Sequence, residues 1–429
     1  MLALLLALQA TVATPAADSV PRVTLAEAIR RSAQLDPDYV RALGQIDDAA
    51  WGRRAAVIAF FVPAIHLGLN ETKYSESFFN PADPANPTST LVVGTASANY
   101  DIFSLRKFAE LPRSKAELQT AEAGELEQRF RTALETESSY YDVLVNQELS
   151  RVAEERVRRA DEGLNVARAR VASGAAVQTD SLQLVLELTR ARVEVLRQRN
   201  TLGTAQHELG RRVGADGPVD AVPFDTSPAP VLPITLAEAV RIGLDQGPQY
   251  QSAQAAERAA DANLTAQKSD YLPTLSIGGV HNRYDTEIFP GASNITSVTL
   301  GLSYPLWNNG QREIEVNRAR VDRDVARAVR EDLERAVRRD VTTAYNTYET
   351  SRAAAELAGV AVTVARENYR MQEMRYRAGA STILDLLDAQ VSVAEAEAGL
   401  VQARYVTRLS LASLEAILGR RLFTDKDAQ

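Results

Sequence analysis

The chain of 429 residues contains no cysteine, three histidines and only 6% aromatic residues. Without cysteine it can form neither a disulfide nor a zinc finger, and it can carry neither a thiol nucleophile nor a cysteine-linked lipid anchor. The net charge is −8, and this excess of acidic groups would repel the phosphates of a nucleic acid. We therefore expect no nucleic-acid partner and no thiol chemistry.

Long hydrophobic runs are confined to the N-terminus. Residues 1–13 are apolar and small residues follow, which indicates a secretory signal peptide over residues 1–17. Beyond it, the longest apolar stretch has 11 residues, from Ala55 to Ile65, whereas a membrane-spanning helix needs about 20. If the mature chain crosses a membrane, the sequence predicts that it does so as β-strands.

Motifs of common enzymes are missing. His207-Glu208 lacks the second histidine of a zinc protease motif. The sequence has neither a G-x-S-x-G nucleophile elbow nor a phosphate-binding G-x-x-x-x-G-K loop. We therefore expect no enzyme activity, no cofactor and no metal site.

What the chain does contain is an internal duplication. Residues 23–30, VTLAEAIR, return as ITLAEAVR at residues 234–241, an offset of 211. Farther along, Gly174 matches Gly379 at an offset of 205. A period of about 200 residues is far longer than a solenoid repeat, so each copy is a whole structural unit.

These matches define two repeats. The first spans residues 18–213 and the second spans residues 234–419. A linker with five prolines, residues 214–233, joins them and cannot be helical throughout, and a C-terminal tail covers residues 420–429. Function should therefore depend on how two copies of one unit combine.

Each repeat contains two stretches that predict β-strands, at about residues 64–73 and 92–103 and at about 274–283 and 297–306. The residues between the first two, 74–91, predict a surface loop. One face of each strand is apolar and the other is small or polar. Lengths of about 10 to 12 residues suit tilted membrane strands of about 9 to 11 residues. The alternation alone would fit a soluble antiparallel sheet equally well.

Very long helical hairpins follow the strands, at residues 105–213 and 311–418. Each begins with a predicted helix of 68 residues, ending at residues 172 and 378. Such a helix extends about 100 Å and exceeds any globular core. The chain then turns at Gly174 or Gly379, because glycine favours the left-handed conformation that ends helices.

Four strands cannot close a membrane barrel, since closed barrels begin at about 8 strands. An open strand edge in lipid leaves unsatisfied backbone groups, so the sequence predicts an oligomer. Two, three or four chains would supply 8, 12 or 16 strands, and the sequence pattern does not indicate which number of chains forms the oligomer.

The order of these elements, duplicated, resembles the TolC-like outer-membrane efflux family, the outer membrane factors. The resemblance covers essentially the whole mature chain. It is carried by YPLWNNG at residues 304–310, by RAG at residues 377–379 and by ILDLLDA at residues 383–389. The first repeat departs from the pattern, because its strand-to-helix junction, residues 100–105, lacks the proline and the glycine pair.

The resemblance implies an α+β membrane protein that forms a homotrimer. Four strands per chain would complete a transmembrane β-barrel in the outer membrane, and the long helices would form an α-helical barrel in the periplasm. It implies a passive exit duct of a tripartite efflux pump or type I secretion system, in contact with outer-membrane lipid. A periplasmic adaptor protein would dock at the tips, Gly174 and Gly379, and an inner-membrane transporter would supply the energy. The alternative is a soluble periplasmic coiled-coil adaptor or scaffold.

Two aspartates near the second tip allow two interpretations. Asp385 and Asp388 lie three residues apart, so their carboxylates share one helix face. Asp385 could simply close a capping box with Thr382 at the positive start of the helix. In a trimer the two would instead form stacked acidic rings, a common device for a cation-favouring constriction. The resemblance implies this second role, at the periplasmic entrance.

The resemblance also implies a latch that holds the entrance shut. Asp180 and Tyr376 correspond to family residues that bond between neighbouring hairpins, although ordinary packing is an alternative role for Tyr376. A basic residue that assists this latch in the family is replaced here by Ser381.

Overall fold

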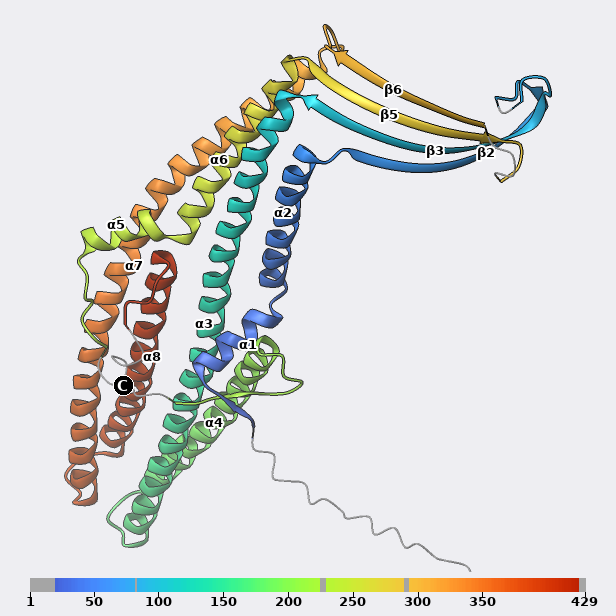
Figure 1. Cartoon of the computed structure of the whole chain (residues 1–429). Helices are drawn as coiled ribbons and strands as arrows, with labels where there is room; N and C mark the ends of the chain where they lie inside the picture. Colours follow the sequence, from blue (N-terminus) through green and yellow to red (C-terminus); the bar gives the residue numbers. More distant parts are fainter. Residues whose placement is uncertain (1–19, 82, 224–228, 289–292, 424–429) are drawn as a thin grey trace, which may run out of the picture.

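The computed structural model describes residues 20–81, 83–223, 229–288 and 293–423. The predicted signal peptide, residues 1–17, and residues 424–429 of the predicted tail lie outside these ranges. A layer of long helices carries a four-stranded sheet that extends from one end of the layer (Figure 1). None of the helices within the described ranges combines the length and the apolar character that crossing a bilayer requires.

The helices follow the same order in both repeats: two short helices, a long helix and a returning helix. In the first repeat they are α1 (Leu25–Leu35), α2 (Pro37–Phe61), α3 (Leu105–Ala172) and α4 (Gln178–Arg212). In the second they are α5 (Leu236–Gln246), α6 (Pro248–Lys268), α7 (Gln311–Arg377) and α8 (Ile383–Leu418). A 3₁₀ turn, Ser269–Tyr271, follows α6. Both long helices lie within one residue of their predicted bounds.

Local capping explains how each repeat begins. Thr24 and Thr235 precede α1 and α5, and each hydroxyl accepts a hydrogen bond from the backbone amide three residues later (3.3 Å). The Asp36 carboxylate caps α2 in a similar way. Pro37 and Pro248 take first-turn positions of α2 and α6, where a backbone N–H is not needed. The duplicated LAEA segment is therefore the same helix start used twice.

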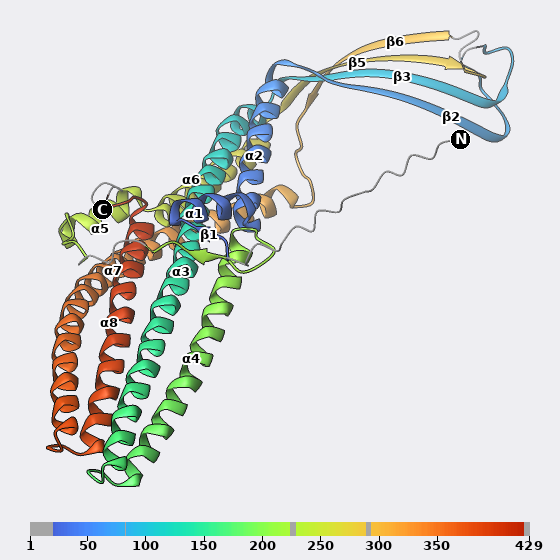
Figure 2. The same cartoon turned by 90° about the horizontal axis from the view of Figure 1, so that it is seen from below.

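The helices lie side by side in one layer. Next to the sheet the order is α2, α3, α6, α7, and toward the opposite end it is α4, α3, α8, α7 (Figures 1 and 2). Two shorter helices thus lie along each long one: α2 and α4 along α3, and α6 and α8 along α7. α7 forms one edge of the layer, while α2 and α4 form the other.

The sheet has the order β2-β3-β5-β6, and each neighbouring pair is antiparallel. Its strands are β2 (Ala64–Phe78), β3 (Thr88–Phe103), β5 (Thr274–Asp285) and β6 (Ser293–Ser303). The two repeats meet where β3 pairs with β5. Two short strands that the sequence does not predict, β1 (Arg22–Val23) and β4 (Asp220–Ala221), pair in parallel.

Three strand predictions, those for β2, β3 and β6, are wrong at their ends. β3 begins at Thr88 rather than at residue 92, and β6 begins at Ser293 rather than at residue 297. The loop predicted at residues 74–91 is shorter, because β2 continues to Phe78, which pairs with Thr88 after a shift in register. Backbone pairing can thus continue beyond the alternating apolar segment. β6 ends at Ser303 rather than at residue 306, because Ser303 pairs with Thr274, the first residue of β5, and the residue before Thr274 is Pro273, which has no backbone N–H for a further ladder bond. Asn309 and Gly310, with left-handed φ values of 57° and 76°, then lead into α7.

Two buried tyrosines tie the linker to the helices. The Tyr140 hydroxyl on α3 donates to the Val222 carbonyl (2.7 Å), and the Tyr348 hydroxyl on α7 donates to the Pro230 carbonyl (2.5 Å). Burial raises the pKa of both tyrosines to about 12, so both remain protonated donors at neutral pH. The described parts of the linker, residues 214–223 and 229–233, are therefore held against both repeats.

Candidate functional site

The hairpin turns lie at the end of the helical layer farthest from the sheet (Figure 1). Gly174 and Gly379 adopt φ values of 76° and 79°, which glycine reaches without steric cost. The amides of Ala175 and Ala380 donate to carbonyls five residues earlier, both at 2.8 Å, and so close the last turns of α3 and α7. Helix termination by both glycines, the simplest interpretation of the sequence, is confirmed.

The side chain of Tyr376 joins the two turns. It is almost fully buried in an apolar cluster that includes Leu184 and Ile383, and its hydroxyl donates to Asp180 at the start of α4 (3.2 Å). Burial, together with the nearby charge of Asp180, raises the pKa of Tyr376, so the hydroxyl stays a donor at neutral pH. The two residues that the family resemblance pairs are therefore in contact, and Tyr376 both packs and bonds.

Sequence reasoning missed Arg170, a basic residue at this contact. Its guanidinium carbon lies 4.5 Å from the centroid of the Tyr376 ring. Its Nη atoms donate to the Tyr376 carbonyl and to the Ala175 carbonyl, the latter at 3.0 Å. Ser381, which stands where the family has a basic residue, reaches only the Gln372 carbonyl at 3.5 Å. A basic residue in the last turn of a helix was the available signal, but its partner lies 206 residues away.

Asp385 and Asp388 are both exposed at the start of α8. Asp385 forms the predicted capping box, in which its carboxylate accepts from the Thr382 amide (2.9 Å) and its own amide donates to the Thr382 hydroxyl (3.3 Å). The hydrogen bond from the Thr382 backbone, followed by that from its side chain, holds the pKa of Asp385 below its ordinary value. The capping role of Asp385 is confirmed, and its carboxylate remains at the surface.

A buried ion pair joins the two repeats farther from the tips. Arg159 on α3 contacts Glu397 on α8 at 2.9 Å, and their side chains are only 10% and 9% exposed. Glu397 also contacts Arg366 on α7 at 2.8 Å. The side-chain amide of Gln390 donates to the Arg159 carbonyl (3.4 Å). The seam between α3 and α8 thus combines apolar packing with a charged network.

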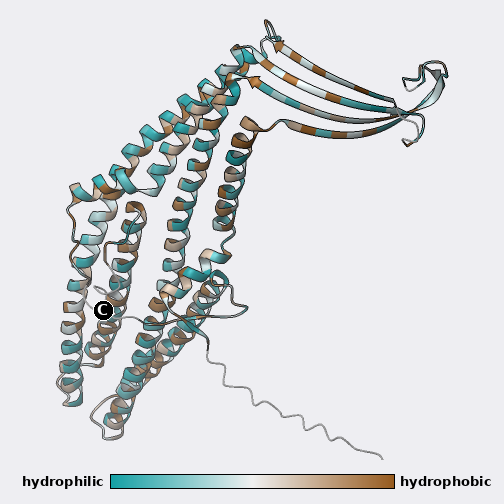
Figure 3. Ribbon diagram, in the orientation of Figure 1, coloured by the Kyte–Doolittle hydropathy of each residue, from teal (hydrophilic) through white to brown (hydrophobic). Residues whose placement is uncertain are grey.

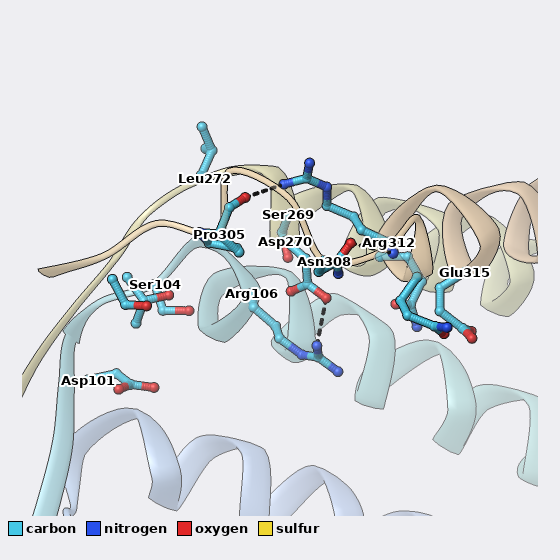
Figure 4. Close-up of a pocket in the computed structure, with 14 residues that line it drawn as sticks. Asp101, Ser104, Arg106, Ser269, Asp270, Leu272, Pro305, Asn308, Arg312 and Glu315 are labelled. Carbon is cyan, nitrogen blue, oxygen red and sulfur yellow. Dashed lines mark hydrogen bonds and ion pairs between the residues drawn. The ribbon is translucent and has the colours of Figure 1, made fainter.

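A cavity of about 420 Å³ lies where the strands meet the long helices (Figure 4). Inside it, Arg106 on α3 forms an ion pair with Asp270 at 2.7 Å. Arg312 on α7 donates to the Pro305 carbonyl (3.1 Å) and stacks on the Tyr271 ring at 4.0 Å. These contacts fix the turn between β6 and α7. Across the described ranges, no group of three or more His, Asp or Glu side chains is placed to hold a metal ion.

Comparison with known proteins gives consistent matches. The family described as outer membrane efflux protein matches residues 28–215 and 242–420. Outer membrane efflux protein BepC of Brucella suis is 24% identical over 332 residues, which cover 76% of this chain and 71% of BepC. Alkaline protease secretion protein AprF of Pseudomonas aeruginosa is 22% identical over 326 residues, 73% of this chain and 66% of AprF. Two other curated relatives are matched over only 55% and 59% of their own length.

The fold is similar to a solved structure over nearly its whole length. The crystal structure of outer membrane protein VceC from Vibrio cholerae superposes with a TM-score of 0.74 at 16% sequence identity. The match covers 93% of this chain and 97% of VceC. At this identity the likeness establishes the fold.

Proposed function

This chain belongs to the outer membrane efflux protein family, and we propose that it works as the exit duct of a tripartite efflux pump or of a type I secretion system. It lies in the outer membrane and extends into the periplasm. In this proposal it is a passive conduit without enzyme activity or cofactor, opened by a periplasmic adaptor and an inner-membrane transporter. Relatives are named for efflux and for protease secretion, so the proposal includes both kinds of cargo.

The observation that carries the proposal is a sheet with two open edges. Within the described residues, β2 and β6 each pair with a strand on one side only. Because neighbouring strands alternate in direction, β2 runs antiparallel to β6. β6 of one copy can therefore pair with β2 of the next, and such head-to-tail contacts close a ring. Three copies would supply twelve strands, above the minimum of about 8 for a closed membrane barrel.

One face of the sheet suits contact with lipid. Apolar residues alternate along both edge strands (Figure 3), and six of them are exposed: Ile65, Leu67, Leu69, Val298, Leu300 and Leu302. The register links Ile65 to Val298 through Ala98 and Gly279, so these side chains point to the same face. Serine, threonine and asparagine dominate the opposite face. We propose that the apolar face contacts outer-membrane lipid and the polar face lines the duct.

The helical layer, like the sheet, ends at two edges that a neighbouring chain could cover. Exposed apolar side chains follow helical spacing on α7 at one edge and on α4 at the other: Leu357, Val360 and Val364 on α7, and Leu182, Leu186 and Leu196 on α4. A ring of chains would bury these edges by packing α7 of one copy against α4 and α2 of the next. With repeats at residues 18–213 and 234–419, a trimer would contain six similar hairpins. The periplasmic adaptor alternative is set aside, because the family match includes both repeats.

The hairpin tips are the proposed periplasmic entrance. They lie at the end of the chain farthest from the sheet (Figure 1). In this proposal the exposed carboxylates of Asp385 and Asp388 line the constriction, and the Tyr376–Asp180 hydrogen bond holds it shut. The adaptor would dock at the turns around Gly174 and Gly379.

Assembly provides the direct test. We expect the mature protein to fractionate with outer membranes and to migrate as an SDS-resistant trimer until the sample is boiled, because closure satisfies the strand edges that lipid cannot. Density-gradient fractionation and gels of heated and unheated samples measure both properties. Recovery as a soluble monomer without detergent would contradict the proposal and would favour the adaptor interpretation.

The two tryptophans test which surface meets the bilayer. Trp307 is 71% exposed in the turn after β6, whereas Trp51 lies on α2 about 15 Å before its end. Tryptophan favours the headgroup region. In vesicles with brominated phospholipid, we expect strong quenching of fluorescence in the Trp51→Phe variant, which retains Trp307, and little in Trp307→Phe. Equal, weak quenching in both would instead place Trp307 against a neighbouring chain.

A further inference from the structure

We propose that Arg170 clamps the two hairpins of one chain together at their tips and so helps to hold the entrance shut. This inference rests on the proposed function, because it concerns the regulation of the proposed entrance. Arg170 lies in the last turn of α3 and reaches both turns. One Nη atom donates to the Tyr376 carbonyl in the last turn of α7, and the other donates to the Ala175 carbonyl just beyond α3.

Several interactions converge on this guanidinium. It stacks on the buried Tyr376 ring at 4.5 Å, a cation–π contact. The Tyr376 carbonyl lies in the last turn of α7, where the backbone carries partial negative charge that favours a cation. A Cβ added at Gly379 would lie 3.5 Å from Arg170, so the guanidinium fills the space beside the second turn. Arg170 therefore holds α3, α7 and both turns in one arrangement.

The duplication supplies an internal comparison. Arg375 has in α7 the place that Arg170 has in α3, five residues before the alanine that closes the turn. It is exposed and donates to the Ala380 carbonyl of its own turn at 3.4 Å. The residue that matches Tyr376 at the offset of 205 is Val171, which offers neither a ring face nor a hydroxyl.

This difference between Arg170 and Arg375 distinguishes two kinds of seam in a ring of chains. One seam lies between the two hairpins of a chain, and the other lies between neighbouring chains. Within a chain, α8 lies beside α3, and the clamp holds the tips on either side of this seam. Between chains, α4 of one copy would lie beside α7 of the next, in the equivalent arrangement. There Arg375 would meet Val171 instead of a tyrosine, so the seam between chains lacks the clamp.

Lysine at position 170 is not expected to form the clamp. A planar guanidinium can lie flat on a ring while it donates in its own plane to two carbonyls. An ammonium group is a point charge on a flexible stem and cannot meet all three partners at once. Arg170→Lys therefore tests the geometry of the clamp rather than the charge alone.

Single-channel recordings of the purified full-length protein in planar bilayers test the proposal. We expect Arg170→Ala and Arg170→Lys to raise the mean conductance about twofold or more, since the tips are no longer held together. The matched control, Arg375→Ala, should leave the conductance at the wild-type level. Equal effects of the two alanine variants would overturn the clamp, as would wild-type conductance in Arg170→Ala.

A second measurement does not depend on conductance. Because the chain has no cysteine, Ser173→Cys and Ala378→Cys place one spin label on each turn. The distance distribution between the two labels of one chain should lengthen and broaden with Arg170→Ala but not with Arg375→Ala. An unchanged distribution would overturn the clamp. If the labels respond while the wild-type protein forms no channel, the proposed function fails and the contact between hairpins stands.

Discussion

Replacing Glu397 with glutamine is expected to lower the free energy of unfolding by about 3 kcal/mol or more, near the lower end of the range of about 3 to 5 for breaking a buried ion pair. The Arg159 guanidinium, 10% exposed, would lose the charge that compensates it. Arg366 would lose the same partner, but it is largely exposed and can be hydrated. The loss therefore arises chiefly from Arg159, which cannot reach bulk water without separating α3 from α8.

The matched control is Glu154→Gln. Glu154 pairs with Arg199 across α3 and α4 at 2.8 Å, but these side chains are 51% and 62% exposed. Exposed pairs contribute about 0 to 1 kcal/mol, so the thermal midpoint of the helical circular dichroism signal in detergent should hardly change. A double variant, Arg159→Leu with Glu397→Leu, removes both charges and should recover most of the loss. Equal midpoints for Glu397→Gln and Glu154→Gln would show that the pair is not buried in the assembled protein.

The features that could be predicted from the sequence have local causes. Gly174 and Gly379 end the long helices because a left-handed residue must follow them, and a single residue type supplies it. Thr24 and Thr235 start helices through bonds that span three residues. The apolar and polar faces of the strands follow from the two-residue period with which side chains alternate along a strand. The duplication then confirms each local interpretation with a second copy.

The features that could not be predicted depend on distant partners. Arg159 and Glu397 are 238 residues apart, and Arg170 and Tyr376 are 206 apart. The helices carry so many arginines and glutamates that spacing does not single out the buried pair from the exposed ones. β1 and β4 contain two residues each, too few to show a period. The ends of β2 and β6 depend on strand pairing and on turn geometry. The alternation of apolar and polar residues does not predict either of them.

Alanine at both Asp385 and Asp388 is expected to remove most of the cation selectivity of the channel in single-channel recordings. In a trimer, six carboxylates would surround one narrow opening, where a low local dielectric strengthens their attraction for cations. Block by trivalent cations added from the periplasmic side should weaken about tenfold or more. Because hydrogen bonds from Thr382 lower the pKa of Asp385, its carboxylate stays charged at pH 7, where the recordings are made.

The capping box permits a control that separates the two roles of Asp385. Thr382→Ala removes the hydroxyl that accepts from the Asp385 amide but keeps both carboxylates. If the aspartates form the constriction, this variant loses helix-end stability and retains selectivity and block, because the fixed charges remain in place. The double alanine variant then shows the opposite pattern in the recordings. If the double variant instead retains full selectivity and full block, Asp385 serves only to start α8, and the charge that selects cations must lie elsewhere along the duct.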